Sequence, residues 1–213
     1  MNVLDRFRLD GKRLFITGGS RGFGRVIALA AAEAGADVAL NARDGEALAR
    51  TAGEVRERGR RAWTFAGDVA QPAVCESLCR QVLAEAGPID ILVNNVGGRN
   101  IDVAVEAEEL DTWQKLVDLN LTHTFLCTKI IGGAMLARGV TVNAICPGLF
   151  MTEPNLAWSK THPEVIETLV QGIPMGRPGE PDEIGPLAVY LASPASSYVT
   201  GAAFVIDGGY TLW

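Results

Sequence analysis

Short apolar runs alternate along the chain with longer segments in which apolar residues recur at helical spacing. The runs are mostly uninterrupted and rich in β-branched or small residues, which indicates strands buried on both faces of a sheet. They predict strands at residues 13–17, 37–41, 62–66, 89–93, 140–145 and 203–206. The helical patterns predict helices at residues 22–34, 46–58, 72–86, 163–171 and 181–192, and one or two helices over residues 107–118 and 119–137.

This alternation predicts the fold class. Strands that alternate with helices form a parallel sheet with helices on both faces, the doubly wound arrangement of a Rossmann fold. A linker rich in Pro, Gly or Ser is not visible, so we assign residues 1–213 to one domain of α/β class. Residues 148–179 have the least regular pattern, and we interpret them as a candidate mobile lid.

Composition and charge exclude several functions. The chain of 213 residues has a net charge of −6, which argues against a broad nucleic-acid surface. Apolar stretches stay well short of the roughly 20 residues of a membrane span, so we expect no membrane association and a cytoplasmic location. The four cysteines, at positions 75, 79, 127 and 146, are interpreted as packed apolar residues in a reducing compartment. Because only two histidines exist, we expect no metal site, and His123 is expected to be structural.

A glycine-rich turn lies between the first expected strand and the first expected helix. It reads Thr17-Gly-Gly-Ser-Arg-Gly-Phe-Gly24, with glycines at 18, 22 and 24 in a Gly-x-x-x-Gly-x-Gly spacing. Glycines let the backbone bend tightly and approach a ligand. The start of the following helix offers unpaired N–H groups and the positive end of the helix dipole. The turn therefore predicts a site for the diphosphate of a dinucleotide.

These motifs resemble the short-chain dehydrogenase/reductase family. Thr-Gly-x-x-x-Gly-x-Gly resembles its cofactor signature, Asp68-Val69 its adenine-contacting pair, and the end of the chain its 3-oxoacyl-carrier-protein reductase branch. Asn94-Asn95-Val96-Gly97 resembles its Asn-Asn-Ala-Gly motif, and Pro147-Gly148 with Thr152 its nicotinamide segment. The resemblance implies Asn120 as a catalytic residue. The turn and the resemblance together imply these cofactor contacts: Gly18, Ser20, Arg21, Gly22, Phe23, Gly24, Arg43, Asp68, Val69, Asn95, Gly97, Pro147, Gly148, Phe150 and Thr152.

The end of the second strand bears on the choice of cofactor. An acid there accepts hydrogen bonds from the ribose hydroxyls of NAD, but residues 41–43 read Asn-Ala-Arg. Arg43, together with Arg21 of the turn, suits the 2′-phosphate of NADP. We therefore expect NADP, with NAD less favoured. The alternative that both arginines are only solvated stays open, and Asp44 nearby weakens the NADP interpretation slightly.

The sequence lacks the element that carries proton transfer in the family. There a tyrosine hydroxyl exchanges a proton with the substrate oxygen, a lysine four residues later lowers its pKa, and a serine holds the same oxygen. These residues belong between the helix of Asn120 and the strand at 140–145, but Gly-Gly-Ala-Met-Leu-Ala-Arg-Gly139 runs directly into Val140. The three tyrosines, at 190, 198 and 210, have no lysine four residues later. Compared with the family, roughly one strand and one helix are missing.

Three explanations stay open: the printed chain omits residues that its parent protein has, the deletion is real, or a divergent site uses other residues. For a real deletion we hypothesise that residues 140–145 move in beside the fourth strand, with the preceding helix as a right-handed crossover. A strand-wide vacancy at that place would rule this out.

Two functions are compatible with these features. The first is an NADP-dependent oxidoreductase that interconverts a ketone and a secondary alcohol, with a 3-oxoacyl thioester or a small polyol as substrate. Activity would be impaired or absent without the serine, tyrosine and lysine. The alternative is a non-catalytic nucleotide-binding or subunit-interaction protein. Family members are often tetramers, so the resemblance also implies a homo-oligomer, either a dimer or a tetramer.

Overall fold

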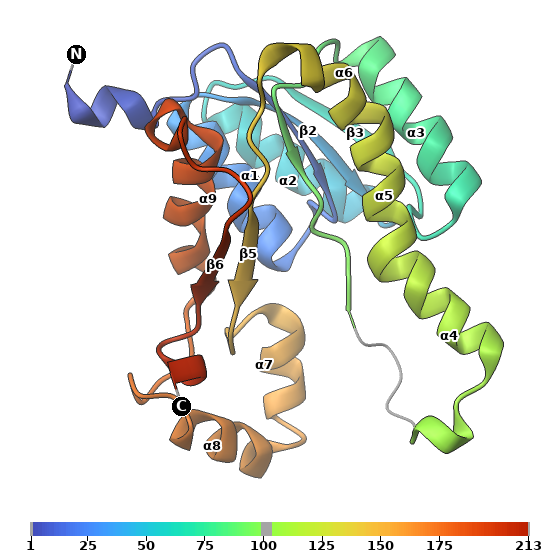
Figure 1. Ribbon diagram of the computed structural model, residues 1–213, viewed down its shortest axis with the longest axis vertical. Coiled ribbons are helices and arrows are strands. Elements are labelled where there is room, and N and C mark those ends of the chain that lie inside the picture. The colour runs from blue at the N-terminus through green and yellow to red at the C-terminus, as the bar shows by residue number, and fades with distance from the viewer. Residues whose placement is uncertain (1, 99–103, 213) are drawn as a thin grey trace.

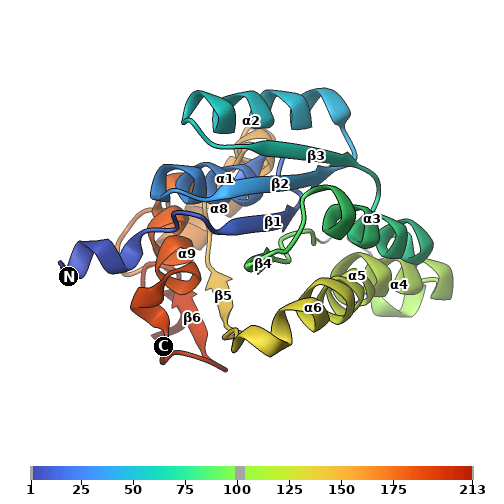
Figure 2. The same ribbon diagram turned by 90° about the horizontal axis from the view of Figure 1, so that it is seen from above.

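The computed structural model describes residues 2–98 and 104–212. A parallel sheet of four strands has the order β3-β2-β1-β4 (Figures 1 and 2). The strands are β1 (Arg13–Thr17), β2 (Asp37–Ala42), β3 (Ala62–Ala66) and β4 (Ile91–Val93). Alternate side chains of β1 and β2 enter different cores, as strand geometry requires, so both faces of this sheet are buried. The expected α/β class with a parallel sheet is confirmed.

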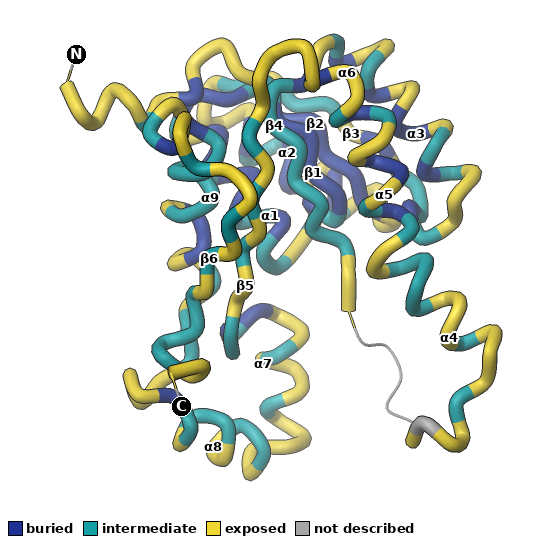
Figure 3. The backbone as a smooth tube through the Cα atoms, viewed as in Figure 1, coloured by how far each residue is buried: buried dark blue, intermediate teal, exposed yellow. Residues whose placement is uncertain are grey.

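Each face of the sheet has its own helical layer. On one face, α1 (Gly22–Ala34), α2 (Gly45–Glu57) and α9 (Ile184–Ala192) pack over the strands. On the other face lie α3 (Pro72–Glu85) and the long helix that begins at Leu110. Figure 3 shows the buried residues concentrated around the four-stranded sheet. The carboxyl ends of β1 and β4 therefore lie between the two helical layers, where ligands bind in this class of fold.

The sequence pattern left open whether residues 107–118 and 119–137 form one helix or two. The structure has one long helix there. It comprises α4 (Leu110–Val117), α5 (His123–Cys127) and α6 (Gly133–Met135). Two π-helical turns, Asp118–Thr122 and Thr128–Gly132, join these parts without a break in helical backbone. The helix ends at Gly139, whose φ of 65° is the left-handed conformation that terminates many helices.

The strands form two separate sheets, and the split between them lies where the missing strand was expected. Strand β5 (Ala144–Pro147) pairs in parallel with β6 (Ala203–Ile206), and these two form a second sheet. Among the described residues, β4 pairs only with β1. The hypothesis that residues 140–145 move in beside the fourth strand is therefore wrong.

Two attachments explain why β5 stays away from β4. Before the strand begins, the Val142 carbonyl accepts a hydrogen bond from the Gly201 amide at 2.7 Å, and the Asn143 side chain donates to the Val199 carbonyl at 2.9 Å. The β6 partner follows α9, which packs closely on α1 because Gly185 has no side chain to meet Ala30. If β5 moved beside β4, it would lose its hydrogen bonds to β6 and to residues 199–201, or α9 would have to move away from α1.

Several boundaries differ from the expected ones. Strand β4 begins at Ile91 rather than at residue 89, and β5 begins four residues later than expected. The region 148–179 contains α7 (Glu153–Ser159), which the sequence pattern did not predict, and the expected α8 (Pro163–Gln171). Short 3₁₀ turns complete the fold at Val3–Phe7, Val105–Ala107, Leu136–Arg138, Pro181–Glu183, Pro194–Ser196 and Tyr210–Leu212. Within the described ranges, none of the helices combines the length and apolar character needed to cross a bilayer.

Candidate dinucleotide-binding site

The glycine turn connects β1 to α1 through backbone conformations that require glycine. Gly18 has a φ of 69° and Gly22 a φ of 54°. A Cβ on Gly24 would lie 2.2 Å from the Gly18 carbonyl oxygen, which is far too close for any side chain. Arg21 precedes α1 in an extended conformation, and its own side chain does not cap the helix. The first amides of α1 are thus open to an acceptor from elsewhere.

Asn95 and Thr17 fasten this turn to the end of β4. The buried Thr17 hydroxyl accepts hydrogen bonds from the amides of Asn95 and Val96, at 3.0 and 3.2 Å. The Asn95 side chain donates to the Thr17 carbonyl at 2.9 Å and to the Gly18 carbonyl at 3.3 Å. A Cβ on Gly18 would lie 2.9 Å from the Asn95 amide nitrogen, so this glycine is needed for the contact.

A carboxylate already lies at the start of α1. The Gly22 amide donates a hydrogen bond of 2.9 Å to a carboxylate oxygen of Glu153, in the first turn of α7. Beside this contact is a cavity of about 250 Å³, lined in part by Met151 and Pro181. The contact shows that this helix end accepts an anionic oxygen, as its dipole favours.

The segment after β5 also reaches the glycine turn. The Phe150 ring is buried and packs edge-on against Phe23 of the turn, with 5.1 Å between the ring centroids. Gly148 passes so close to Asp207 that a Cβ would lie 2.6 Å from the Asp207 Cβ. Thr152 is nearly buried and precedes α7. The structure thus brings residues 148–152 against the turn, while Pro147 ends β5.

Asn120 holds the loop that follows β4. Its side-chain oxygen accepts a hydrogen bond from the Gly98 amide at 3.0 Å, and its nitrogen donates to the Gly98 carbonyl at 3.1 Å. The same nitrogen donates to the Leu116 carbonyl one turn earlier in the helix, at 2.9 Å. Gly97 lies directly beside this amide. Asn120 therefore has a positioning role in this structure, and a catalytic role stays a prediction.

The residues expected to bind adenosine follow β2 and β3. Arg43 follows β2 directly, is largely exposed, and lies 3.9 Å from an Asp68 carboxylate oxygen. The carboxylate of Asp44 is turned away, because it caps α2 by accepting from two amides at 3.0 Å. The Val69 side chain is buried in the core, which leaves only its backbone for a ligand. Arg21 is exposed at the turn itself.

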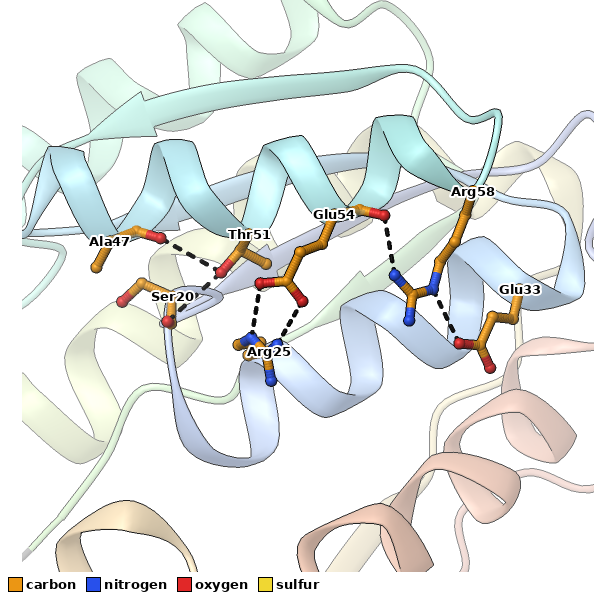
Figure 4. A network of polar contacts seen from close by, with 7 residues as sticks. All are labelled: Ser20, Arg25, Glu33, Ala47, Thr51, Glu54 and Arg58. Carbon is orange, nitrogen blue, oxygen red and sulfur yellow. Dashed lines mark hydrogen bonds and ion pairs between the residues drawn. The ribbon is translucent and has the colours of Figure 1, made fainter.

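Polar contacts fix α2 beside the turn (Figure 4). The Thr51 hydroxyl donates to the Ser20 carbonyl at 3.5 Å and to the Ala47 carbonyl at 3.3 Å. Two ion pairs join α1 to α2, one between Arg25 and Glu54 and one between Arg58 and Glu33 at 2.9 Å. Arg25 is therefore engaged by a carboxylate, while Arg43 is the exposed arginine at the end of β2.

The tyrosines of the chain have other surroundings. Tyr190 packs against Phe7 and Phe204, with ring centroids 6.1 and 6.3 Å away. Tyr198 is fully exposed, and the Tyr210 ring lies against Gly172 at the end of α8. In the part of the chain that the structure describes, none of these contacts reaches the glycine turn, Asn95 or Asn120.

Comparison with known proteins decides the family. The family model described as short chain dehydrogenase matches residues 12–139, and the model described as Enoyl-(Acyl carrier protein) reductase matches residues 127–211. The chain belongs to the short-chain dehydrogenase family. The first match ends at Gly139, the residue after which the expected strand and helix are missing from the sequence.

Relatives of this short-chain dehydrogenase act on different substrates. Galactitol 2-dehydrogenase (L-tagatose-forming) of Cereibacter sphaeroides is 33% identical, over 97% of this chain and 98% of the relative. A 3-oxoacyl-[acyl-carrier-protein] reductase of Synechocystis is 31% identical, over 96% and 99%. The crystal structure of a gluconate 5-dehydrogenase from Burkholderia cenocepacia, in complex with NADP and tartrate, is 32% identical with a TM-score of 0.91, and each chain is covered completely.

The length of these alignments accords with an internal gap. The alignment with galactitol 2-dehydrogenase spans 253 residues, whereas this short-chain dehydrogenase has 213, so at least 40 positions of the alignment have no counterpart here.

Three residues of the site are not among the cofactor contacts expected from the sequence: Thr17, Asn41 and Glu153. Asn41 is buried in β2 and donates to the carbonyls of Phe65 and Gly67, at 2.9 and 3.1 Å. A polar residue inside an apolar strand was the available signal for Asn41.

Proposed function

We propose that this chain binds NADP(H) at the glycine turn and has lost most or all of the hydride-transfer activity of its family. The observation that supports the binding proposal is the start of α1, where the Gly22 amide already donates to a carboxylate oxygen. Gly24 lets the Gly18 carbonyl and the Asn95 side chain pack closely against the first turn of α1, where a Cβ would collide with both. A diphosphate has the charge and acceptor oxygens that this arrangement favours.

NADP rather than NAD is supported by the end of β2. Ala42 offers no carboxylate for the ribose hydroxyls, and the Asp44 carboxylate is occupied as a helix cap. Arg43 is exposed and close to Asp68, so its guanidinium can turn to a 2′-phosphate at little cost. The solved gluconate 5-dehydrogenase with 32% identity contains NADP, which agrees with this proposal.

The family reaction interconverts a ketone and a secondary alcohol, and we assign the lineage of this chain to small polyol or keto substrates. The similarity to a galactitol dehydrogenase supports that class, and the similarity to a 3-oxoacyl reductase keeps the thioester class as the second candidate. The bound nicotinamide supplies or accepts the hydride. The chain would supply orientation, but it has no Tyr-x-x-x-Lys pair to move the accompanying proton.

Separate measurements of binding and turnover test this proposal. Intact mass first establishes that the purified chain has the printed sequence. NADPH fluorescence then measures binding, and loss of NADPH absorbance measures turnover with a panel of keto sugars and 3-oxoacyl thioesters. We expect saturable binding and turnover at least about a thousand-fold below that of an intact relative, because acid–base catalysis contributes about 10²–10⁴-fold. Turnover near the intact rate would overturn the proposed loss of activity.

A further inference from the structure

A cluster of three cysteines lies in the core between α3 and α5, outside the dinucleotide site. Cys75 and Cys79 are one turn apart on α3, and Cys127 is the last residue of α5. The Cys127 sulfur lies 3.6 Å from the sulfur of Cys75 and 3.6 Å from that of Cys79. All three residues are completely buried. Figures 1 and 2 both show α3 and α5 side by side.

The spacing suits a metal ion better than a disulfide. The three sulfurs all lie within 4.8 Å of one another. A zinc–thiolate bond of about 2.3 Å places the sulfurs of a tetrahedral site about 3.8 Å apart, close to the two shorter separations. A disulfide requires about 2.05 Å, and all four cysteines of the chain are free.

His123 lies next to the cluster but is not one of its candidate ligands. It is one helical turn before Cys127, and its backbone carbonyl is 3.9 Å from the Cys75 sulfur. Its buried ring has its Nε2 atom 3.3 Å from the Thr124 hydroxyl. Among the described residues, the ligand atoms that lie within 4.8 Å of one another are the three cysteine sulfurs.

We propose that Cys75, Cys79 and Cys127 form a structural three-thiolate site for a thiophilic divalent cation of the Zn²⁺ class. The bound ion would join α3 to α5 by replacing the thiol protons, which leave to solvent as the metal–sulfur bonds form. This site is independent of the dinucleotide turn and would stabilise the helical layer that faces the split in the sheet.

Cadmium titration of the full chain tests the site directly. The reduced, chelator-treated protein receives Cd²⁺ both when folded and during refolding, because the cluster lies in the core. We expect one equivalent to produce thiolate-to-metal absorption and to raise the unfolding temperature. Failure of the folded wild-type chain to produce this absorption under both conditions would overturn the proposal.

Variants of the cysteines locate the ligands. Cys127→Ala should abolish the absorption, and Cys75→Ser should weaken binding at least about ten-fold. Cys146→Ala is the matched control, because Cys146 is the exposed cysteine in β5, and it should bind like wild type. Circular dichroism confirms that each variant is folded. Binding that survives Cys127→Ala would contradict the assignment.

Discussion

Thr17 and Asn95 show how single side chains create the candidate site. The motif around Asn95 is recognisable from the sequence, and Thr17 is predicted there as the first residue of the glycine turn, but not as the contact between the turn and Asn95. Its hydroxyl accepts from two amides of the chain after β4, and this pairing holds the glycine turn against the neighbouring strand. Such a contact joins residues 78 and 79 positions apart, so no local pattern reveals it. The glycines were predictable because their spacing is itself local.

Replacing Arg43 by alanine should reduce NADPH affinity by about ten-fold, equivalent to about 1.4 kcal/mol. The reason is the loss of a charge-assisted contact to the 2′-phosphate. NADH affinity should change little, because NADH lacks that phosphate. Fluorescence titration of both coenzymes measures the difference, with Arg50→Ala as control, since Arg50 is an exposed arginine further along α2. An equal loss for both coenzymes would show that Arg43 does not select NADP.

Replacing Glu153 by glutamine should strengthen NADPH binding by roughly three-fold or more. The carboxylate accepts from the Gly22 amide and repels a diphosphate at the same helix end. The gain should shrink at high salt, because screening weakens repulsion between exposed charges. Calorimetry at two salt concentrations measures it, and Glu164→Gln, in the first turn of α8, is the control. Weaker binding in Glu153→Gln would mean that Glu153 supports the cofactor instead of competing with it.

At the scale of elements, apolar runs located the strands well where both faces are buried. Strands β1, β2 and β3 lie where the sequence places them, within one residue. Strand β5 does not, because its pairing partner β6 determines its register through Val142 and Asn143. The α7 helix was missed although Thr152, Glu153 and Pro154 form a helix-start pattern.

Hydrogen exchange should show β4 and β5 to be less protected than β1. Among the described residues each pairs on one side only, so their amides that face the split are open to solvent or to local opening. Strand β1 pairs on both sides and serves as the internal reference. Exchange measured by mass spectrometry should be at least about ten-fold faster for peptides covering residues 91–93 and 144–147. Protection equal to that of β1 would indicate that something fills the split.

At the scale of the whole molecule, large apolar side chains of the long helix are left uncovered. Leu121 and Phe125, on the long helix, are 66% and 61% exposed, as is Trp113 at 58%. Exposed apolar residues this large and this close in sequence mark a surface that a missing element or another chain would cover. The sequence could not predict how the fold accommodates the loss, because this depends on α9 and β6, far along the chain.

Restoring the missing unit should restore catalysis. A graft of the corresponding strand and helix of galactitol 2-dehydrogenase, inserted between Gly139 and Val140, supplies a partner for β4 and β5 together with the proton donor. We expect ketone reduction to rise at least about a hundred-fold. A graft with phenylalanine in place of its tyrosine is the matched control and should restore stability without activity. If neither stability nor activity improves, the split does not correspond to the position of the lost unit.

Calorimetric titration of the full chain with NADPH is the decisive test of dinucleotide binding at the glycine turn. We expect saturable binding at one site, weaker binding of NADH, and no detectable binding in Gly24→Ala, whose Cβ would collide with the Gly18 carbonyl. Gly53→Ala is the control, because a Cβ there meets open space on α2. No uptake of either coenzyme by the folded wild-type chain would contradict a dinucleotide site at this turn.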